Sequence, residues 1–341
     1  DYARETLTSH FKTSGLKGFG VDSMESGIVA AGAALHYLSE TRHRRLGHIH
    51  SVRRLASEDY VWMDRFTIEN LEIFETRDRN GVSLLEVMDR TQSPMGGRML
   101  RRWLALPLKE AEAIERRQEG VDYLVREAEP LARLGEQLSR MGDLERLIAK
   151  VATAKIGPRE CVQLKNSLLA VLPVRGLLEA SGTNALQEMA EALDPCEPLV
   201  ERIQAVLVEE APAGMAKGGA IAAGFSPELD ELRGLAESGK DYLDQMLERE
   251  SERTGITSLK IASNNVFGYY IEVRNTHKDK VPEGWIRKQT LVSAERYITE
   301  ELKEYEAKIL GAEERILELE QQLFAQLVVW MQEYIRPVQE D

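Results

Sequence analysis

The stretch SNNVFGYYIEVRN, residues 263–275, decides the fold, because its apolar side chains alternate while the flanking chain has a helical period. Asn264-Asn265 is typical of a tight turn between two strands. The strand candidates are residues 258–263, 266–273 and 286–292, and in the second of them Phe267, Tyr269, Ile271 and Val273 would share one face. The sequence therefore predicts a small antiparallel sheet between residues 257 and 299.

Long helices are predicted on both sides of this sheet. Ser226-Pro227 begins a helix that Gly255 would end. Its seam follows heptad steps of three and four through Leu229, Leu232, Ala236, Gly239, Leu243 and Met246. After the sheet the same steps pass through Ile298, Leu302, Tyr305, Ile309, Ala312, Ile316, Leu319 and Leu323. Two such seams predict an antiparallel helix pair that carries the sheet at its tip.

The rest of the chain has mostly helical signals. Ser83 with Glu86, and Ser93 before Pro94, are typical of helix starts. Residues 1–45 resemble the end of an α/β unit, with a loop and short strand at 15–21 and a helix capped by Asp22. We therefore expect a mainly α fold: a helical core, and a long antiparallel helix pair with a small antiparallel β domain at its tip.

Composition limits the possible functions. The chain has 341 residues and a net charge of −13, which argues against coating nucleic acid along its whole length. Its two cysteines have no metal-binding spacing, and no apolar run is long enough to span a membrane, so a cytoplasmic protein is expected. The chain begins at Asp1 without an initiator Met, and we expect a segment of a longer protein.

The predicted sheet differs from the rest of the chain in charge. Residues 257–299 contain seven basic and four acidic residues, a net charge of +3, which leaves −16 on the remainder. Basic side chains with Asn, Ser and Thr donors suit phosphate oxygens, and no base-reading helix is predicted there. We expect any nucleic-acid contact to be directed at the backbone and independent of sequence. The alternative is an ordinary fluctuation of surface charge.

Five stretches of the sequence resemble one family. SNNVFGYYIEV and RKQTLVSAERYITEELKEYEAKI are similar to the clamp of the MutS DNA mismatch-repair family, and SPMGGRMLRRWLALPL to the start of its helical core. GGAIAAGFSPELDELR resembles the beginning of its lever, and FGVDSMESGIVAAGAALHYL the end of its connector domain. The resemblance implies a connector end at 1–45, a core at 46–225, an outgoing lever helix at 226–256, a clamp at 257–299 and a returning lever helix at 300–341.

The resemblance also implies a mechanical role in DNA mismatch repair. In that family the clamp holds the phosphate backbone of duplex DNA, and the lever connects the clamp to an ATPase domain. The mismatch-reading domain would precede Asp1 and the ATPase domain would follow Asp341, so we expect no catalytic, cofactor or metal residues in this chain. For the full-length protein the resemblance implies ATP and Mg²⁺ as cofactors, a homodimer, and a MutL-type partner bound through the connector. It implies no membrane contact.

The candidate DNA-binding residues lie in the clamp. The resemblance places phosphate contacts on Arg287 and Lys288 and a hydrogen-bond donor on Ser293, around a stretch that includes Gln289. Many bacterial relatives carry a Lys where this chain has Val292, so one expected charge is missing. Further basic candidates are Lys260, Arg274, Lys278 and Lys280.

Two other functions remain open. One is an architectural coiled-coil arm whose β tip binds protein. The other is a role on recombination junctions, which some members of the same family have in place of mismatch reading. The connector-like residues 1–45 favour the mismatch-repair branch of the family over this one.

Several local patterns have simpler explanations. The match to GxxxxGK at 234–241 has Asp241 where a P-loop needs Ser or Thr, and it lies in the predicted heptad helix. We interpret the group of His43, His48 and His50 as part of a solvated linker. The acidic group is interpreted as a charged helix face and comprises Glu248, Glu250 and Glu252. The basic group is interpreted as a salt-bridged surface and comprises Arg98, Arg101 and Arg102.

Overall fold

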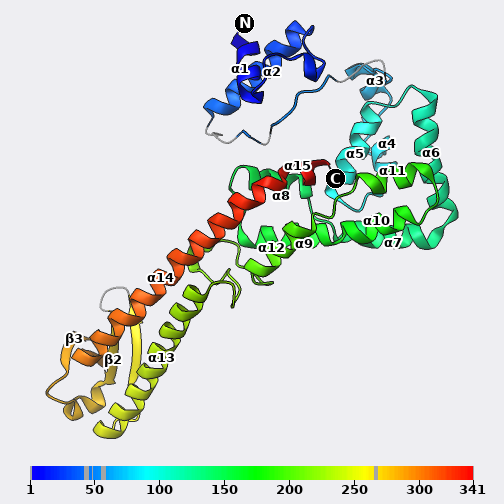
Figure 1. Ribbon diagram of the computed structural model, residues 1–341. Helices are drawn as coiled ribbons and strands as arrows, with labels where there is room; N and C mark the ends of the chain where they lie inside the picture. The colour runs from blue at the N-terminus through cyan, green and yellow to red at the C-terminus, as the bar shows by residue number, and fades with distance from the viewer. Residues whose placement is uncertain (1, 42–45, 48, 55–58, 265–267, 341) are drawn as a thin grey trace. The chain divides into compact units, whose positions relative to one another are not determined.

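The computed structural model describes residues 2–41, 46–47, 49–54, 59–264 and 268–340, and it divides into two compact units (Figure 1). The helical unit comprises residues 1–213 and 326–341, and the sheet unit comprises residues 214–325. The chain is mainly helical, and its described strands form one sheet, as the sequence predicts.

The first residues of the helical unit form a small cluster of helices. It contains α1 (Tyr2–Phe11), the 3₁₀ helix η1 (Lys17–Phe19) and α2 (Glu25–Glu40), packed around Leu7, Leu16, Val21, Ile28 and Leu35. The strand expected at 15–21 is wrong, because η1 occupies this stretch. Asp22 does not cap α2 either: its carboxylate pairs with Arg4 instead, and Met24 takes the N-cap position.

The remainder of the helical unit is a set of short helices. Their bounds are α3 (Arg65–Asn70), α4 (Leu84–Met88), α5 (Pro94–Ala105), α6 (Ala111–Arg126), α7 (Ala128–Arg140), α8 (Leu144–Ala152), α9 (Pro158–Leu169), α10 (Val171–Glu179), α11 (Asn184–Ala192), α12 (Glu197–Val206) and α15 (Ile335–Glu340). The predicted helix starts are confirmed. Ser83 and Glu86 form a capping box at α4, and the Ser93 hydroxyl accepts a hydrogen bond from the Gly96 amide at α5.

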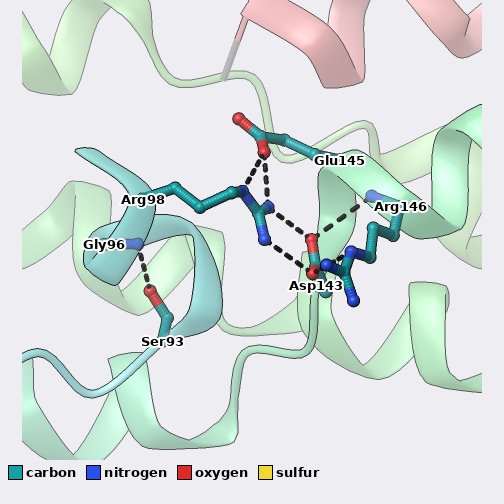
Figure 2. A network of polar contacts seen from close by, with 6 residues as sticks. All are labelled: Ser93, Gly96, Arg98, Asp143, Glu145 and Arg146. Atoms are coloured by element: carbon teal, nitrogen blue, oxygen red, sulfur yellow. Dashed lines mark hydrogen bonds and ion pairs between the residues drawn. The ribbon is translucent and has the colours of Figure 1, made fainter. Parts of the chain in front are cut away.

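An ion-pair network connects α5 to α8 (Figure 2). The Arg98 guanidinium donates to both carboxylate oxygens of Asp143, at 2.9 and 2.7 Å, and its Nε donates to Glu145 at 2.9 Å. Asp143 also accepts from the Arg146 amide and thereby caps α8. The interpretation of Arg98 as a salt-bridging residue is confirmed.

Removal of Arg98 should make the unfolding free energy of the helical unit vary less with pH in the acidic range. The hydrogen bonds from Arg98 are the largest cause that holds the pKa of Asp143 below its ordinary value. A carboxyl group whose pKa is lower in the folded than in the unfolded chain stabilises the fold at pH values above its unfolded pKa of about 3.9. This contribution is lost as the pH falls through the folded pKa. Arg98→Ala should therefore cost about 1 kcal/mol of unfolding free energy at pH 7, because the pair is partly exposed, and less at pH 2.

Hydrogen exchange of α5 and α8 at several pH values measures this effect. Arg126→Ala is the matched control, since its ion pair with Asp122 is exposed on both sides and should contribute less than about 0.5 kcal/mol. A loss for Arg98→Ala that is equally large at both pH values would contradict the assignment to Asp143.

The sheet unit is built on two long helices. After the 3₁₀ helix η2 (Met215–Lys217) comes α13 (Pro227–Thr254), which begins at the Ser226 cap and ends at Gly255 in a left-handed conformation. The second long helix, α14 (Glu300–Met331), is followed by η4 (Gln332–Tyr334) and α15, so the expected helix over 300–341 is interrupted. Figure 1 shows α13 and α14 side by side.

Side-chain contacts establish that the two helices are antiparallel. Arg233 of α13 pairs with Glu320 of α14 at 2.7 Å, and farther along α13 Arg249 pairs with Glu301 at 2.7 Å. At Gly239 the helices approach so closely that an added Cβ would lie 2.5 Å from the Ile309 side chain. The heptad seam thus uses a glycine where the backbones come together.

The sheet has four antiparallel strands in the order β1-β2-β4-β3. They are β1 (Lys260–Asn264), β2 (Gly268–Arg274), β3 (Ile286–Thr290) and β4 (Ala294–Ile298), with the 3₁₀ helix η3 (Asn275–Lys280) after β2. Three strands match the predicted ones. The sequence interpretation missed β4, because Ile298 also fits the heptad seam of the following helix.

One hydrophobic core joins the sheet to both helices. It contains Ile271 and Val273 of β2, with Tyr269 packed against them, so these members of the predicted strand face share the core side. Leu243 and Met246 of α13 and Leu302 and Ile309 of α14 belong to the same core. Phe267 and Asn265 lie outside the described residues. The opposite face of the sheet and the segments around it carry the candidate site.

Candidate nucleic-acid interface

Five of the predicted basic residues are exposed cations. Within the described residues, no hydrogen bond or ion pair at bonding distance engages the side chains of Lys260, Arg274, Lys278, Lys280 and Lys288. Lys288 lies where the pairing of β3 with β4 is interrupted by a register shift. Such side chains keep all their donors available to an anion, and their charge is not cancelled by a bonded carboxylate.

Arg287 differs from these five because it already has a partner. It pairs with β4 Tyr297 in the strand register, and its Nη1 donates to the Glu295 carboxylate at 3.2 Å. The Tyr297 hydroxyl binds the other Glu295 oxygen. That hydroxyl, and after it Arg287, holds the pKa of Glu295 below its ordinary value, while burial and Glu295 raise the pKa of Tyr297 to about 12. Arg287 therefore offers only part of its hydrogen-bonding capacity to a phosphate.

Gln289 is also engaged within the sheet. Its side-chain oxygen accepts a hydrogen bond from Arg296 at 2.9 Å, and Arg296 also binds Glu272 at 3.2 Å and covers the Tyr270 ring at 4.3 Å. In the strand register Lys260 lies opposite Glu272. Lys260, Glu272, Arg296 and Gln289 thus form one row across all four strands, on the face opposite to the hydrophobic core.

Ser293 lies in the exposed turn between β3 and β4, beside Val292, whose side chain is fully exposed. The end of β2 is next to this turn, since Arg274 is paired with Ala294. The same end of the sheet, where β2 ends and β4 begins, therefore carries Arg274, Ser293 and the residues of η3. Lys260 is separated from Lys288, because β1 and β3 are opposite edges of the sheet with two strands between them.

Two residues near the site have roles that the sequence interpretation missed. Asn275 binds the β3–β4 turn, and Arg296 organises the polar row. Only the alternation of β4 could have revealed Arg296, and that strand was hidden by the heptad pattern. Nothing local in the sequence marks Asn275, because its partners are far along the chain.

The remaining patterns have structural roles. The GxxxxGK match lies inside α13, as predicted. Glu248 and Glu252 are exposed, but Glu250 is buried and pairs with Arg253 at 2.9 Å, so the charged-face interpretation is wrong for Glu250. Arg101 lies 4.4 Å from the centre of the Phe74 ring. His43 and His48 fall outside the described residues.

Among the described residues, no group of three or more His, Cys, Asp and Glu side chains could hold a metal ion. No helix in this part of the chain is long and apolar enough to cross a membrane.

Comparisons with known proteins agree with the sequence motifs. The family description MutS domain III matches residues 66–340. Curated proteins named DNA mismatch repair protein MutS from Christiangramia forsetii, Flavobacterium psychrophilum and Parabacteroides distasonis are 62%, 58% and 54% identical over 100%, 99% and 99% of this chain. The chain spans 39% of the length of each of these relatives. With this coverage and the helical architecture described above, the chain belongs to the MutS family.

Proposed function

We propose that the chain serves DNA mismatch repair by holding duplex DNA at the clamp, residues 257–299, and by coupling the clamp mechanically to the rest of a larger mismatch-recognition ATPase. The observation that carries the proposal is the group of five exposed cations around the sheet that have no bonded partner among the described residues, in a chain of net charge −13. A local positive surface on an acidic protein attracts a polyanion to one place only.

The clamp should bind the DNA backbone without reading its sequence. Its described elements are strands and one short 3₁₀ helix, and its exposed donors are mainly Lys and Arg. Such groups make point contacts with phosphate oxygens, which are the same for every base pair. We accordingly assign the phosphate contacts to Lys288, Lys278, Lys280 and Arg274, with Ser293 as a neutral donor. Arg287 contributes less because it shares its guanidinium with Glu295.

The helix pair α13–α14 supports the coupling role. Its two helices are joined at separate levels by Arg249–Glu301, by a stacked Tyr242–Tyr305 pair with ring centroids 3.7 Å apart, and by Arg233–Glu320. Contacts at several levels limit sliding and bending, so a displacement at the clamp is transmitted along both helices.

The ATPase, the homodimer and the MutL-type partner belong to this proposal for the longer protein. The GxxxxGK match does not fit ATP, because it is helical and Asp241 stands where Ser or Thr would bind magnesium. We therefore expect no ATP hydrolysis from this chain.

Fluorescence anisotropy of a labelled duplex tests the proposal. The chain should bind a homoduplex and a single-mismatch duplex equally, with a log–log salt slope of about −3 to −4, because only a few phosphates are neutralised. A slope near zero, or strong preference for the mismatch, would count against a backbone clamp. Absence of binding at low salt would favour the alternative of an architectural arm with a protein-binding tip.

A further inference from the structure

One residue connects the two loops that carry candidate contacts. Asn275 is the first residue of η3, and its backbone amide donates to the Ser293 carbonyl at 3.1 Å. Its side-chain amide donates to the Val292 carbonyl at 3.0 Å. A third hydrogen bond, from the Leu291 amide to the Ala294 carbonyl at 2.8 Å, closes the turn at residues 291–294. Asn275 therefore fixes this turn against η3 by binding the carbonyl groups of both central residues of the turn, Val292 and Ser293.

These bonds determine what the turn presents to solvent. Carbonyl oxygens carry partial negative charge and repel a phosphate, whereas backbone N–H groups attract it. Asn275 engages the carbonyls of Val292 and Ser293, while the amides of the same two residues have no acceptor within the described residues. The Ser293 side chain is exposed, and Val292 contributes no charge. The turn thus offers hydrogen-bond donors to an anion.

The same residue determines where the lysines of η3 lie relative to these donors. Lys278 and Lys280 are exposed on η3, a few residues after Asn275. We propose that Asn275 is a positioning residue of the DNA interface: it fixes the turn at 291–294 beside η3, so that the donors of the turn and the lysines of η3 contact one stretch of phosphate backbone. This inference rests on the proposed function of the clamp.

Asn275→Ala in the full chain is the test, measured by fluorescence anisotropy on a duplex. Loss of one positioning hydrogen bond should weaken binding about five-fold. The log–log salt slope should not change, because the substitution removes no charge. Thr276→Ala is the matched control: it lies next to Asn275 on η3, is exposed, and has no side-chain hydrogen bond within the described residues, so its affinity should equal that of the unaltered chain.

Two further measurements separate positioning from general destabilisation. If Asn275 acts through the turn, its effect should shrink when Ser293→Ala is already present, so the two substitutions are not additive. In a chain labelled with ¹⁵N-valine, the Val292 amide signal should shift on addition of duplex, and this shift should be reduced by Asn275→Ala. The unfolding temperature should be the same for both chains.

The outcomes distinguish this inference from the proposed function. If the unaltered chain shows no salt-dependent binding, the proposed function and this inference are both overturned. If the unaltered chain binds but Asn275→Ala binds equally well, or if its effect is fully additive with Ser293→Ala, only the role of Asn275 is overturned. A five-fold loss with an unchanged salt slope and non-additivity supports it.

Discussion

Replacement of Lys278, Lys280 and Lys288 by glutamate should weaken duplex binding on the order of 100-fold at low salt and reduce the magnitude of the log–log salt slope by about 3. Each lysine is exposed and has no bonded carboxylate within the described residues. Their reversal therefore removes phosphate contacts without breaking an ion pair in the fold. Anisotropy across a salt series, on homoduplex and mismatched duplex, measures both quantities.

Arg287 is excluded from this set for a structural reason. Arg287→Glu would place a second carboxylate beside Glu295, which is buried, and the resulting repulsion would destabilise the sheet. Loss of binding by that variant would not separate contact from folding. Lys280 and Lys288 avoid this ambiguity, and Lys278 acts on Glu295 through its charge alone, without a hydrogen bond, so its reversal perturbs the sheet less than that of Arg287.

The control for the lysine variant carries the same change in net charge elsewhere. Lys17→Glu, Lys109→Glu and Lys155→Glu change three exposed lysines of the helical unit. If binding depends on the local surface of the clamp, this control should retain most of its affinity. An equal loss in both triple variants would mean that net charge, and not the clamp, governs binding.

Glu320→Ala should produce the largest loss of stability, about 3 kcal/mol in the unfolding free energy of the sheet unit. The Glu320 side chain is 1% exposed. One of its oxygens accepts from Arg233 at 2.7 Å, and the other accepts from the Ala220 backbone amide at 3.1 Å. Its removal leaves the buried Ala220 amide without an acceptor and takes from Arg233 its partner carboxylate, so that the guanidinium keeps the Ile221 carbonyl but loses its closest charge partner.

Hydrogen exchange of α13 and of the part of α14 within the sheet unit reports this loss. Glu320→Gln should cost roughly half as much, because an amide can accept only one of the two hydrogen bonds. Glu318→Ala is the control on the same helix, since its ion pair with Arg315 is exposed and should contribute less than about 0.5 kcal/mol. Similar protection in the Glu320→Ala and Glu318→Ala variants would refute the buried role of Glu320.

Glu320 should also affect the loop that precedes α13. Arg233 also donates to the Ile221 carbonyl at 2.8 Å, so the carboxylate, the guanidinium and the loop before α13 form one network. If the helix pair transmits displacement, Glu320→Ala should loosen this loop as well as the pair. Faster exchange at residues 218–221 would accompany the loss.

Periodicity in the sequence determined the main architecture. Heptad steps give both long helices, and the alternation at Tyr269, Ile271 and Val273 gives a strand with a core face, because side-chain direction follows the backbone period. Caps at Ser83, Ser93 and Ser226 were also predictable, since the capping side chain binds an amide only a few residues away. The family was apparent from motifs in this same sequence.

Partner choice was decided by the tertiary structure. The sequence counts Arg287 and Lys288 as equal charges, but strand pairing places Glu295 beside Arg287, while no carboxylate within the described residues pairs with Lys288. Asp22 has a good capping sequence, yet it binds Arg4, because a charged partner from α1 competes with the local amide.

The strand β4 and the role of Asn275 show the same limit. Ile298 satisfies both the alternation of a strand and the heptad of a helix, and only pairing with β2 and β3 selects the strand. Asn275 acquires its role from carbonyls 17 and 18 residues away in the chain. Local periodicity fixes which elements form, because it depends on neighbours in sequence; the partner of each polar group depends on neighbours in space.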